Sequence, residues 1–146
     1  MAELRRTAEA VWRGDLRGGK GRVSSESGVL EDVGYSFSTR FENEPGTNPE
    51  ELIAAAHAAC FSMAFANTLF VRGYSPESIE THATCILAPQ TSGGFAITRM
   101  VLKVQGRVPN MDQAQFKQIA KAADKECPVS NLLREGLEIE LEAILV

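Results

Sequence analysis

The sequence predicts an α+β fold with one domain over residues 1–146 and the element order βββ-α-ββ-α-α-β. Three observations predict it: period-two segments near the amino terminus, a long uncharged segment after a helix-start signal, and an amphipathic helix pattern over residues 112–125. We expect the helices to gather on one face of a sheet. The length agrees with one domain, because domains most often contain about 100–150 residues.

The amino-terminal part is expected to form three strands over residues 7–13, 23–27 and 35–41. In the third segment, alternate side chains would share one strand face: Tyr35, Phe37, Thr39 and Phe41. The glycine-rich segment 14–21 approaches the spacing of a phosphate-binding loop, but Gly21 stands where that loop needs Ser or Thr. A strand pattern follows it, so we interpret the segment as a hairpin turn.

A long helix is predicted from Pro49 to about Val71. Asn48 suits the N-cap, and Glu50 and Glu51 suit the positive end of a helix. Residues 52–71 carry no formal charge and have the length of a membrane span. Four polar side chains interrupt that run: His57, Ser62, Asn67 and Thr68. We therefore expect a buried core helix of a soluble protein.

The second half is expected to form strands over residues 79–87 and 95–108, with a turn at residues 92–94. The helix over residues 112–125 should end at Cys127, because Pro128 disfavours helical geometry in the residue before it. A short helix over residues 128–134 and a last strand over residues 137–145 complete the pattern.

Composition excludes several classes of protein. Fifteen basic and nineteen acidic residues give a net charge of −4, which argues against a nucleic-acid partner. Three cysteines are too few, and odd in number, for a secreted disulfide framework. We find no export signal at the start of the chain, so we expect a cytoplasmic protein without a membrane partner. In the cytoplasm a disulfide is more often catalytic than structural.

The three cysteines differ in their local surroundings. Cys85 shares a strand face with apolar residues and is interpreted as structural. Cys60 lies in the long helix three residues after His57, so a Cys–His pair is geometrically open, and a packed core cysteine is equally compatible. Zinc needs three or four ligands, and beyond Cys60 and His57 only His82 and two other cysteines remain to supply them. We therefore expect no metal site. Cys127 should begin a short helix, where the helix dipole favours the thiolate; a reactive thiol and an inert cap both remain open.

Three motifs together identify a resemblance. The sequence reads NPEEL over residues 48–52, AHAACFSMA over residues 56–64, and CPVS over residues 127–130, with Cys127 placed 67 positions after Cys60. This combination resembles the OsmC/Ohr family of osmotically inducible and organic hydroperoxide resistance proteins. Residues 38–42 and 45–47 look like the OsmC branch. In the Ohr branch the functional arginine lies in the amino-terminal hairpin, which leaves Arg13 or Arg17 as the alternative to Arg40.

The resemblance implies a thiol-dependent peroxidase for organic hydroperoxides and hydrogen peroxide. It assigns Cys60 as the peroxidatic cysteine and Cys127 as the resolving cysteine, joined by a disulfide during turnover. Arg40 and Glu50 match the charged pair that activates the thiol. It implies no bound cofactor and an external dithiol reductant, typically a lipoylated protein. Nearby apolar side chains would suit an alkyl hydroperoxide: Phe41, Phe61, Met63 and Phe65.

Helix geometry adds a prediction about assembly. Glu50 and Cys60 are ten residues apart on one helix, which is about 15 Å along its axis. If two long helices pack antiparallel and cross at Ala55, Glu50 approaches Cys60 of the partner subunit. Small side chains permit such close packing: Ala54, Ala55, Ala56, Ala58 and Ala59. We therefore expect a homodimer in which each active site uses both chains. The resemblance to the OsmC/Ohr family implies that this dimer is intertwined, with β-sheets wrapped around two long central helices.

Two other functions remain open on the residues. The same apolar cavity could belong to a binding module for a lipid or small ligand, with the cysteines as bystanders. Alternatively, Cys60 with His57 as its base could form a hydrolase. Substitution of Cys60 by Ser separates the first from a peroxidase, and substitution of His57 by Ala separates the second.

Overall fold

The structure, a computed structural model, describes residues 2–143 and confirms the α+β class. The chain divides into two compact units, Met1–Ile53 and Ala54–Val146. Each unit contains its own small antiparallel sheet, with three strands in the first and two in the second. The prediction of one sheet within one chain is therefore wrong, since no ladder of hydrogen bonds joins the two sheets in the described part.

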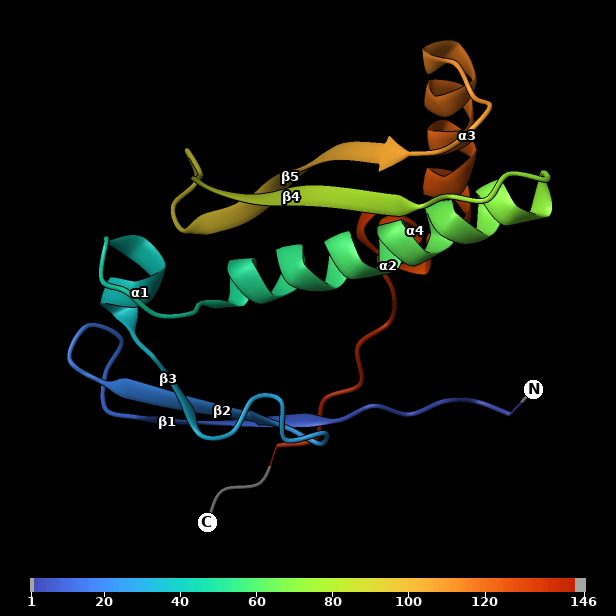
Figure 1. Cartoon of the computed structure of the whole chain (residues 1–146). Helices are drawn as coiled ribbons and strands as arrows, with labels where there is room; N and C mark the ends of the chain where they lie inside the picture. Colours follow the sequence, from blue (N-terminus) through green and yellow to red (C-terminus); the bar gives the residue numbers. More distant parts are fainter. Residues whose placement is uncertain (1, 144–146) are drawn as a thin grey trace. The chain divides into compact units, whose positions relative to one another are not determined.

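The first unit contains strands β1 (Ala8–Arg13), β2 (Lys20–Ser25) and β3 (Val33–Tyr35), paired antiparallel in sequence order (Figure 1). Ala10 lies opposite Val23, and Val23 lies opposite Val33. The glycine-rich segment forms the turn between β1 and β2, as predicted, and Gly14 adopts a positive φ of 94° that favours glycine. A strand follows this turn, so no helix start faces a phosphate there.

The predicted strand over residues 35–41 is wrong. The chain leaves β3 at Tyr35 and forms a short helix, α1 (Phe37–Phe41). Ser36 caps this helix: its hydroxyl accepts from the Thr39 backbone N–H, and the Thr39 hydroxyl accepts from the Ser36 backbone N–H. Phe37 and Phe41, one helical turn apart, stack at 4.8 Å between ring centroids. Two aromatic residues four positions apart suit a helix as well as a strand, and the capping box decides for the helix.

The long helix α2 (Pro49–Val71) has the predicted bounds. The Asn48 side chain accepts a hydrogen bond from the Glu51 backbone N–H at 2.8 Å, which confirms the predicted N-cap. By length and composition alone α2 could cross a membrane, although 28% of its most apolar window is buried within this single chain. Phe61, Phe65 and Leu69 of α2 form part of the hydrophobic core. As predicted, α2 is a core helix.

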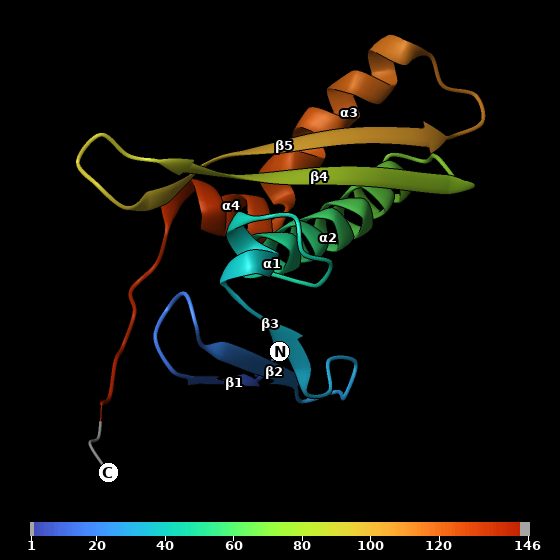
Figure 2. The ribbon, with the colours of Figure 1, turned by 90° about the vertical axis from the view of Figure 1, so that its left-hand side faces the viewer.

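The second unit pairs β4 (Ser78–Pro89) with β5 (Phe95–Arg107) in an antiparallel hairpin. Gly93 and Gly94 both adopt positive φ angles in the predicted turn between them. Helices α3 (Gln113–Glu126) and α4 (Pro128–Glu135) follow, as predicted. Figures 1 and 2 show α2 and α4 on the same side of the hairpin.

The core of the second unit lies between α2, α3 and the hairpin. Phe65 is fully buried, and its ring lies 5.0 Å from that of Phe116 and 5.7 Å from that of Phe61. Ile79, Leu102 and Val104 of the hairpin pack against this cluster. The buried set also contains Cys127, so one of the two motif cysteines is part of the core itself.

The predicted last strand over residues 137–145 is wrong as far as residue 143; residues 144 and 145 lie outside the described part. Residues 137–143 belong to no helix or strand. Glutamates alternate there with apolar side chains that are all exposed: Leu137, Ile139 and Leu141. The segment has the alternation of a strand, but a strand needs a neighbouring edge to satisfy its backbone groups.

Candidate active site

The structure brings Cys60 and Cys127 together. Cys60 lies on α2 and Cys127 lies between α3 and α4, yet their Sγ atoms are 3.5 Å apart and share a hydrogen bond. Both are thiols. A disulfide has an S–S distance of about 2.05 Å, so the sulfurs need approach by only about 1.5 Å to bond. The arrangement permits a reversible dithiol–disulfide cycle.

Cys127 is held at a helix junction. It is the C-cap of α3 and the N-cap of α4, with Pro128 at the first position of α4. The Ser130 backbone N–H donates to Cys127 Sγ at 3.4 Å. Burial raises the pKa of Cys127, but hydrogen bonds from Ser130, Cys60 and Val129 outweigh burial, so its pKa lies below the ordinary value. This agrees with the expectation that the start of a short helix favours the thiolate.

Cys60 has the opposite shift within a single chain. Burial raises its pKa, a hydrogen bond from the Val129 backbone lowers it, and the neighbouring Cys127 raises it again. The net result is a pKa above the ordinary value. Cys127 is therefore the more acidic thiol of the pair as this chain arranges them, and a positive charge close to Cys60 would favour its thiolate.

Arg40 and Glu50 form an ion pair within the first unit. Arg40 Nε donates to both carboxylate oxygens at 3.2 and 3.1 Å, and Nη2 donates to Oε1 at 2.7 Å. The Glu50 side chain is only 10% exposed and that of Arg40 is 34% exposed. The guanidinium is held in a fork on one side, as in bidentate pairs, and its other nitrogen remains for a second anion.

The two alternative arginines have other surroundings. The Arg17 guanidinium lies 4.8 Å from the centroid of the Phe37 ring. Arg13 ends β1 and is exposed, opposite Lys20 of β2. The Arg40 guanidinium is the one that a buried carboxylate orients, so among these three arginines the fixed geometry belongs to Arg40.

A cavity of about 400 Å³ lies beside Arg40 in the first unit. Its walls come from β1, the β1–β2 turn, β3 and α1, and they are mostly aromatic or apolar: Trp12, Leu16, Tyr35, Phe37 and Phe41. Phe41, one of the predicted substrate-contacting residues, lines it together with Arg40. The correction of the third strand to a helix matters here, because α1 places both side chains at this cavity.

The other three predicted substrate-contacting residues do not form one wall within the chain. Phe61 and Phe65 point into the core of the second unit, and Phe65 is fully buried. Met63 is 75% exposed. On a helix, residues two positions apart point in nearly opposite directions, so Met63 cannot share a face with Phe61 and Phe65.

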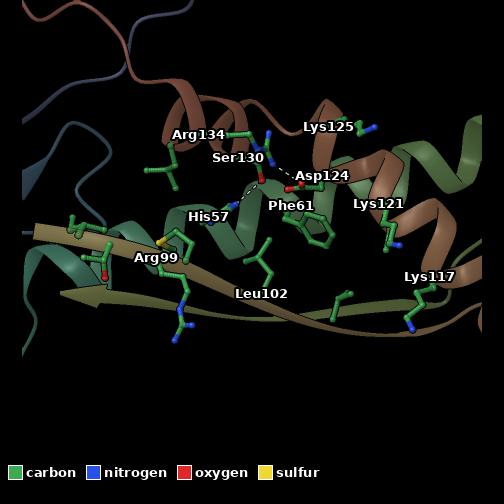
Figure 3. A pocket seen from close by; sticks show the side chains of 16 residues that line it. His57, Phe61, Arg99, Leu102, Lys117, Lys121, Asp124, Lys125, Ser130 and Arg134 are labelled. Atoms are coloured by element: carbon green, nitrogen blue, oxygen red, sulfur yellow. Dashed lines mark hydrogen bonds and ion pairs between the residues drawn. The ribbon is translucent and has the colours of Figure 1, made fainter. Parts of the chain in front are cut away.

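A second cavity, of about 770 Å³, lies in the second unit between β5, α3 and α4 (Figure 3). His57 and Ser130 lie at its wall, and His57 Nε2 is 2.7 Å from Ser130 Oγ. Both residues are buried. Burial lowers the pKa of His57, which nearby Asp124 raises and Arg134 lowers.

The His57–Ser130 contact is the part of the site that sequence reasoning missed. The two residues are 73 positions apart, and the sequence suggested Cys60 as the partner of His57. One signal could have indicated this contact. His57 and Ser130 lie three residues from Cys60 and Cys127 in the AHAACFSMA and CPVS motifs, so two cysteines that meet bring these residues close as well. Cys85 is half-buried on β4 opposite Met100 of β5. Among residues 2–143, no cluster of three or more His, Cys, Asp or Glu side chains could hold a metal ion.

Comparisons with known proteins agree with this geometry. The sequence profile of the OsmC-like protein family matches residues 41–142. The chain is 47% identical to peroxiredoxin OsmC of Escherichia coli (strain K12) over 139 residues, which cover 95% of this chain and 96% of that protein. It is 30% identical to the organic hydroperoxide resistance protein OhrB of Bacillus subtilis over 127 residues, or 86% and 91% of the two chains. The crystal structure of that OhrB matches with a TM-score of 0.66 at 27% identity, over 93% of this chain and 96% of the other.

Proposed function

Because the chain belongs to the OsmC-like protein family, we propose that it is a thiol-dependent peroxidase that reduces organic hydroperoxides to alcohols. The observation that carries the proposal is the approach of Cys60 and Cys127 to 3.5 Å from separate motifs. The relatives named as a peroxiredoxin and as organic hydroperoxide resistance proteins support the same chemistry. The same cysteines would also reduce hydrogen peroxide, with water as the product.

The reaction begins at Cys60. Its thiolate attacks the O–O bond of the hydroperoxide, an S–O bond forms, and the alkoxide takes up a proton and leaves as the alcohol. Cys60 is then a sulfenic acid, oxidised by two electrons. The Cys127 thiolate attacks this sulfur, the S–O bond breaks, and the hydroxide leaves as water after protonation. An external dithiol, of the lipoyl type, reduces the resulting disulfide and restores both thiols.

Arg40 and Glu50 activate Cys60 across a dimer in this proposal. Ten residues of α2 separate Glu50 from Cys60 of the same chain, about 15 Å along the helix axis. Within one chain the pKa of Cys60 is raised, and a cation from the partner subunit would lower it. A guanidinium about 4 Å from the thiolate favours ionisation by up to about 4 kcal/mol at a partly screened dielectric. Arg40 of the partner subunit, oriented by Glu50, supplies it.

Unpaired surfaces of the second unit support a homodimer. A row of side chains on α2 recurs every fourth residue and is exposed in the single chain: Ala55, Ala59, Met63 and Asn67. Alanines in such a row allow two helix backbones to pack closely. The exposed alternating segment 137–143 offers a strand to a neighbouring edge. We assign the chain as one functional domain of a cytoplasmic dimer with two central α2 helices.

The cavity beside Arg40 supports a preference for organic hydroperoxides. An alkyl group would contact its aromatic walls, while the hydroperoxide end would face the guanidinium. Phe41 belongs to this cavity. Of the other three predicted residues, we propose that the exposed Met63 contacts substrate in the dimer, while Phe61 and Phe65 belong to the core of the second unit.

The hydrolase alternative has less support. The hydrogen-bond partner of the His57 Nε2 atom is Ser130, so His57 is not placed as a base for Cys60. A peroxidase needs no such base, because the thiolate is its nucleophile. The ligand-binding module is separated by turnover measurements on cysteine variants.

The test is turnover of tert-butyl hydroperoxide, a fatty-acid hydroperoxide and hydrogen peroxide with dihydrolipoamide as reductant. Cys60→Ser must abolish turnover, and Cys127→Ser must stop it after the first oxidation. Cys85→Ser is the matched control and should turn over at the wild-type rate. Turnover that survives Cys60→Ser would overturn the proposal, and retention of a bound lipid with no peroxide consumption would favour the binding module.

The composite site has its own test, in which Arg40→Ala and Cys60→Ser chains are coexpressed. Each homodimer should be inactive, but each heterodimer contains one intact site. Random pairing should then restore roughly a quarter of the wild-type activity. No restoration, with heterodimers present by native mass spectrometry, would place Arg40 and Cys60 of one chain in the same site.

A further inference from the structure

A line of polar contacts leads from a buried histidine to the sulfur of Cys127. His57 Nε2 lies 2.7 Å from Ser130 Oγ. Ser130 in turn contacts Cys127, because its backbone N–H donates to Sγ at 3.4 Å. The Ser130 backbone and side chain are among the groups that lower the pKa of Cys127. His57 and Ser130 are each only 4% exposed, so water does not compete freely for these contacts.

The burial of His57 Nδ1 determines the direction of these hydrogen bonds. This atom is buried and has no hydrogen-bond partner among residues 2–143. A buried N–H without an acceptor is rarer in native structures than an unused acceptor, so the neutral ring carries its proton on Nε2. Nε2–H then donates to Ser130 Oγ. The Ser130 hydroxyl, already accepting from His57, is left to donate its own proton to Cys127 Sγ.

The charges around His57 favour the same neutral state. Asp124 on α3 and Arg134 on α4 act on it in opposite directions and neutralise each other in an ion pair of 2.6 Å. Burial is the largest influence and lowers the pKa of His57. The other charged residues lining the same cavity are all cationic: Arg99 on β5, and Lys117, Lys121 and Lys125 on α3 (Figure 3). Their positive charges disfavour protonation of His57.

We propose that His57 is a positioning residue for the resolving cysteine, because it fixes the Ser130 hydroxyl as a donor to Cys127 Sγ. The inference rests on the proposed peroxidase function and deepens it at one step. Cys127 must attack the Cys60 sulfenic acid before further oxidation, and donors to its sulfur keep it as the reactive thiolate. The first step, attack of Cys60 on the hydroperoxide, uses none of these donors directly, and a Cys127 thiolate acts on it only by raising the pKa of Cys60.

The experiment follows both steps after mixing reduced enzyme with one equivalent of tert-butyl hydroperoxide. The variants are Ser130→Ala, His57→Leu and the conservative His57→Gln, whose side-chain N–H can replace Nε2–H. Sulfenic acid formation should not slow in any of the three, because a less anionic Cys127 raises the pKa of Cys60 less. Disulfide formation should slow about tenfold in Ser130→Ala and His57→Leu, the effect of one lost hydrogen bond to a charged group. His57→Gln should restore the wild-type rate.

A second readout distinguishes positioning from a merely structural role. In a Cys60→Ser, Cys85→Ala background, the pH profile of Cys127 alkylation should move to higher pH in His57→Leu and return in His57→Gln. A wild-type alkylation profile in His57→Leu, or wild-type disulfide formation in both His57→Leu and Ser130→Ala, would overturn the inference alone. Absence of peroxide-dependent sulfenic acid in the wild type would overturn the proposed function, and the inference with it.

Discussion

Replacement of Arg40 by Lys tests whether the oriented fork, and not merely a positive charge, is required. Arg40 uses two nitrogens on Glu50, Nε at 3.1 and 3.2 Å and Nη2 at 2.7 Å. A lysine ammonium can reproduce one of these two donors, because it is a point charge on a flexible stem. The substitution therefore removes one charge-assisted hydrogen bond from a carboxylate that is only 10% exposed.

The magnitude follows from the partial exposure of the pair. A hydrogen bond to a charged group contributes about 1.5–3 kcal/mol, and the lower end applies because the Arg40 side chain is 34% exposed. We expect Arg40→Lys to lower the free energy of unfolding by about 1–1.5 kcal/mol. Oxidation of Cys60 by hydroperoxide should slow at least about tenfold, since the cation is no longer aimed at the thiolate.

The assay is a double-mutant cycle with Glu50→Gln, measured by urea unfolding and by single-turnover oxidation of Cys60. If the two side chains act as one unit, Arg40→Lys should cost much less in the Glu50→Gln background, with a coupling of about 1 kcal/mol. Arg17→Lys and Arg13→Lys are the matched controls and should be near neutral in both measurements. Additive effects of Arg40→Lys and Glu50→Gln, or a larger kinetic loss in Arg17→Lys, would refute the reasoning.

Three further predictions concern the second unit. Phe65→Ala should lower the free energy of unfolding by about 3–5 kcal/mol in urea, because Phe65 is fully buried against Phe116; a loss below about 1 kcal/mol would contradict the core described here. Cys127→Ser should leave the Cys60 sulfenic acid without a thiol at 3.5 Å, so intact-mass measurements after excess hydroperoxide should show sulfinic acid, which the wild type should resist. Burial lowers the pKa of His57 below its ordinary 6.5, so the unfolded chain binds more protons, and stability should fall as the pH drops below about 6.5. His57→Gln should remove that part of the pH dependence in denaturation curves, and an unchanged slope would place its origin elsewhere.

Local signals predicted α2 well. Asn48, Pro49 and the two glutamates form a complete helix-start signal, and the structure begins the helix at Pro49. The hairpin of β4 and β5 was equally accessible, because its alternation and its Ser-Gly-Gly turn lie within one short stretch. These elements depend on contacts between residues close in sequence.

The errors have physical causes that lie beyond local alternation. Tyr35, Phe37, Thr39 and Phe41 alternate like a strand, but the Ser36 capping box directs the chain into a helix at that point. Apolar and charged residues do alternate over residues 137–143, but in the described part of the chain this segment pairs with no strand. The His57–Ser130 contact spans 73 positions, so spacing rules for one helix could not locate it.

The place of Cys127 has a consequence for the oxidised protein. This one residue closes α3 and opens α4, and its sulfur touches α2 through Cys60. A Cys60–Cys127 disulfide would link α2 covalently to the junction of α3 and α4. The α3 carboxyl end and the α4 amino end could then no longer fray independently. Deuterium uptake at the backbone amides of residues 124–131 should therefore slow when the enzyme is oxidised, and each catalytic cycle would alternately tighten and loosen this corner of the molecule.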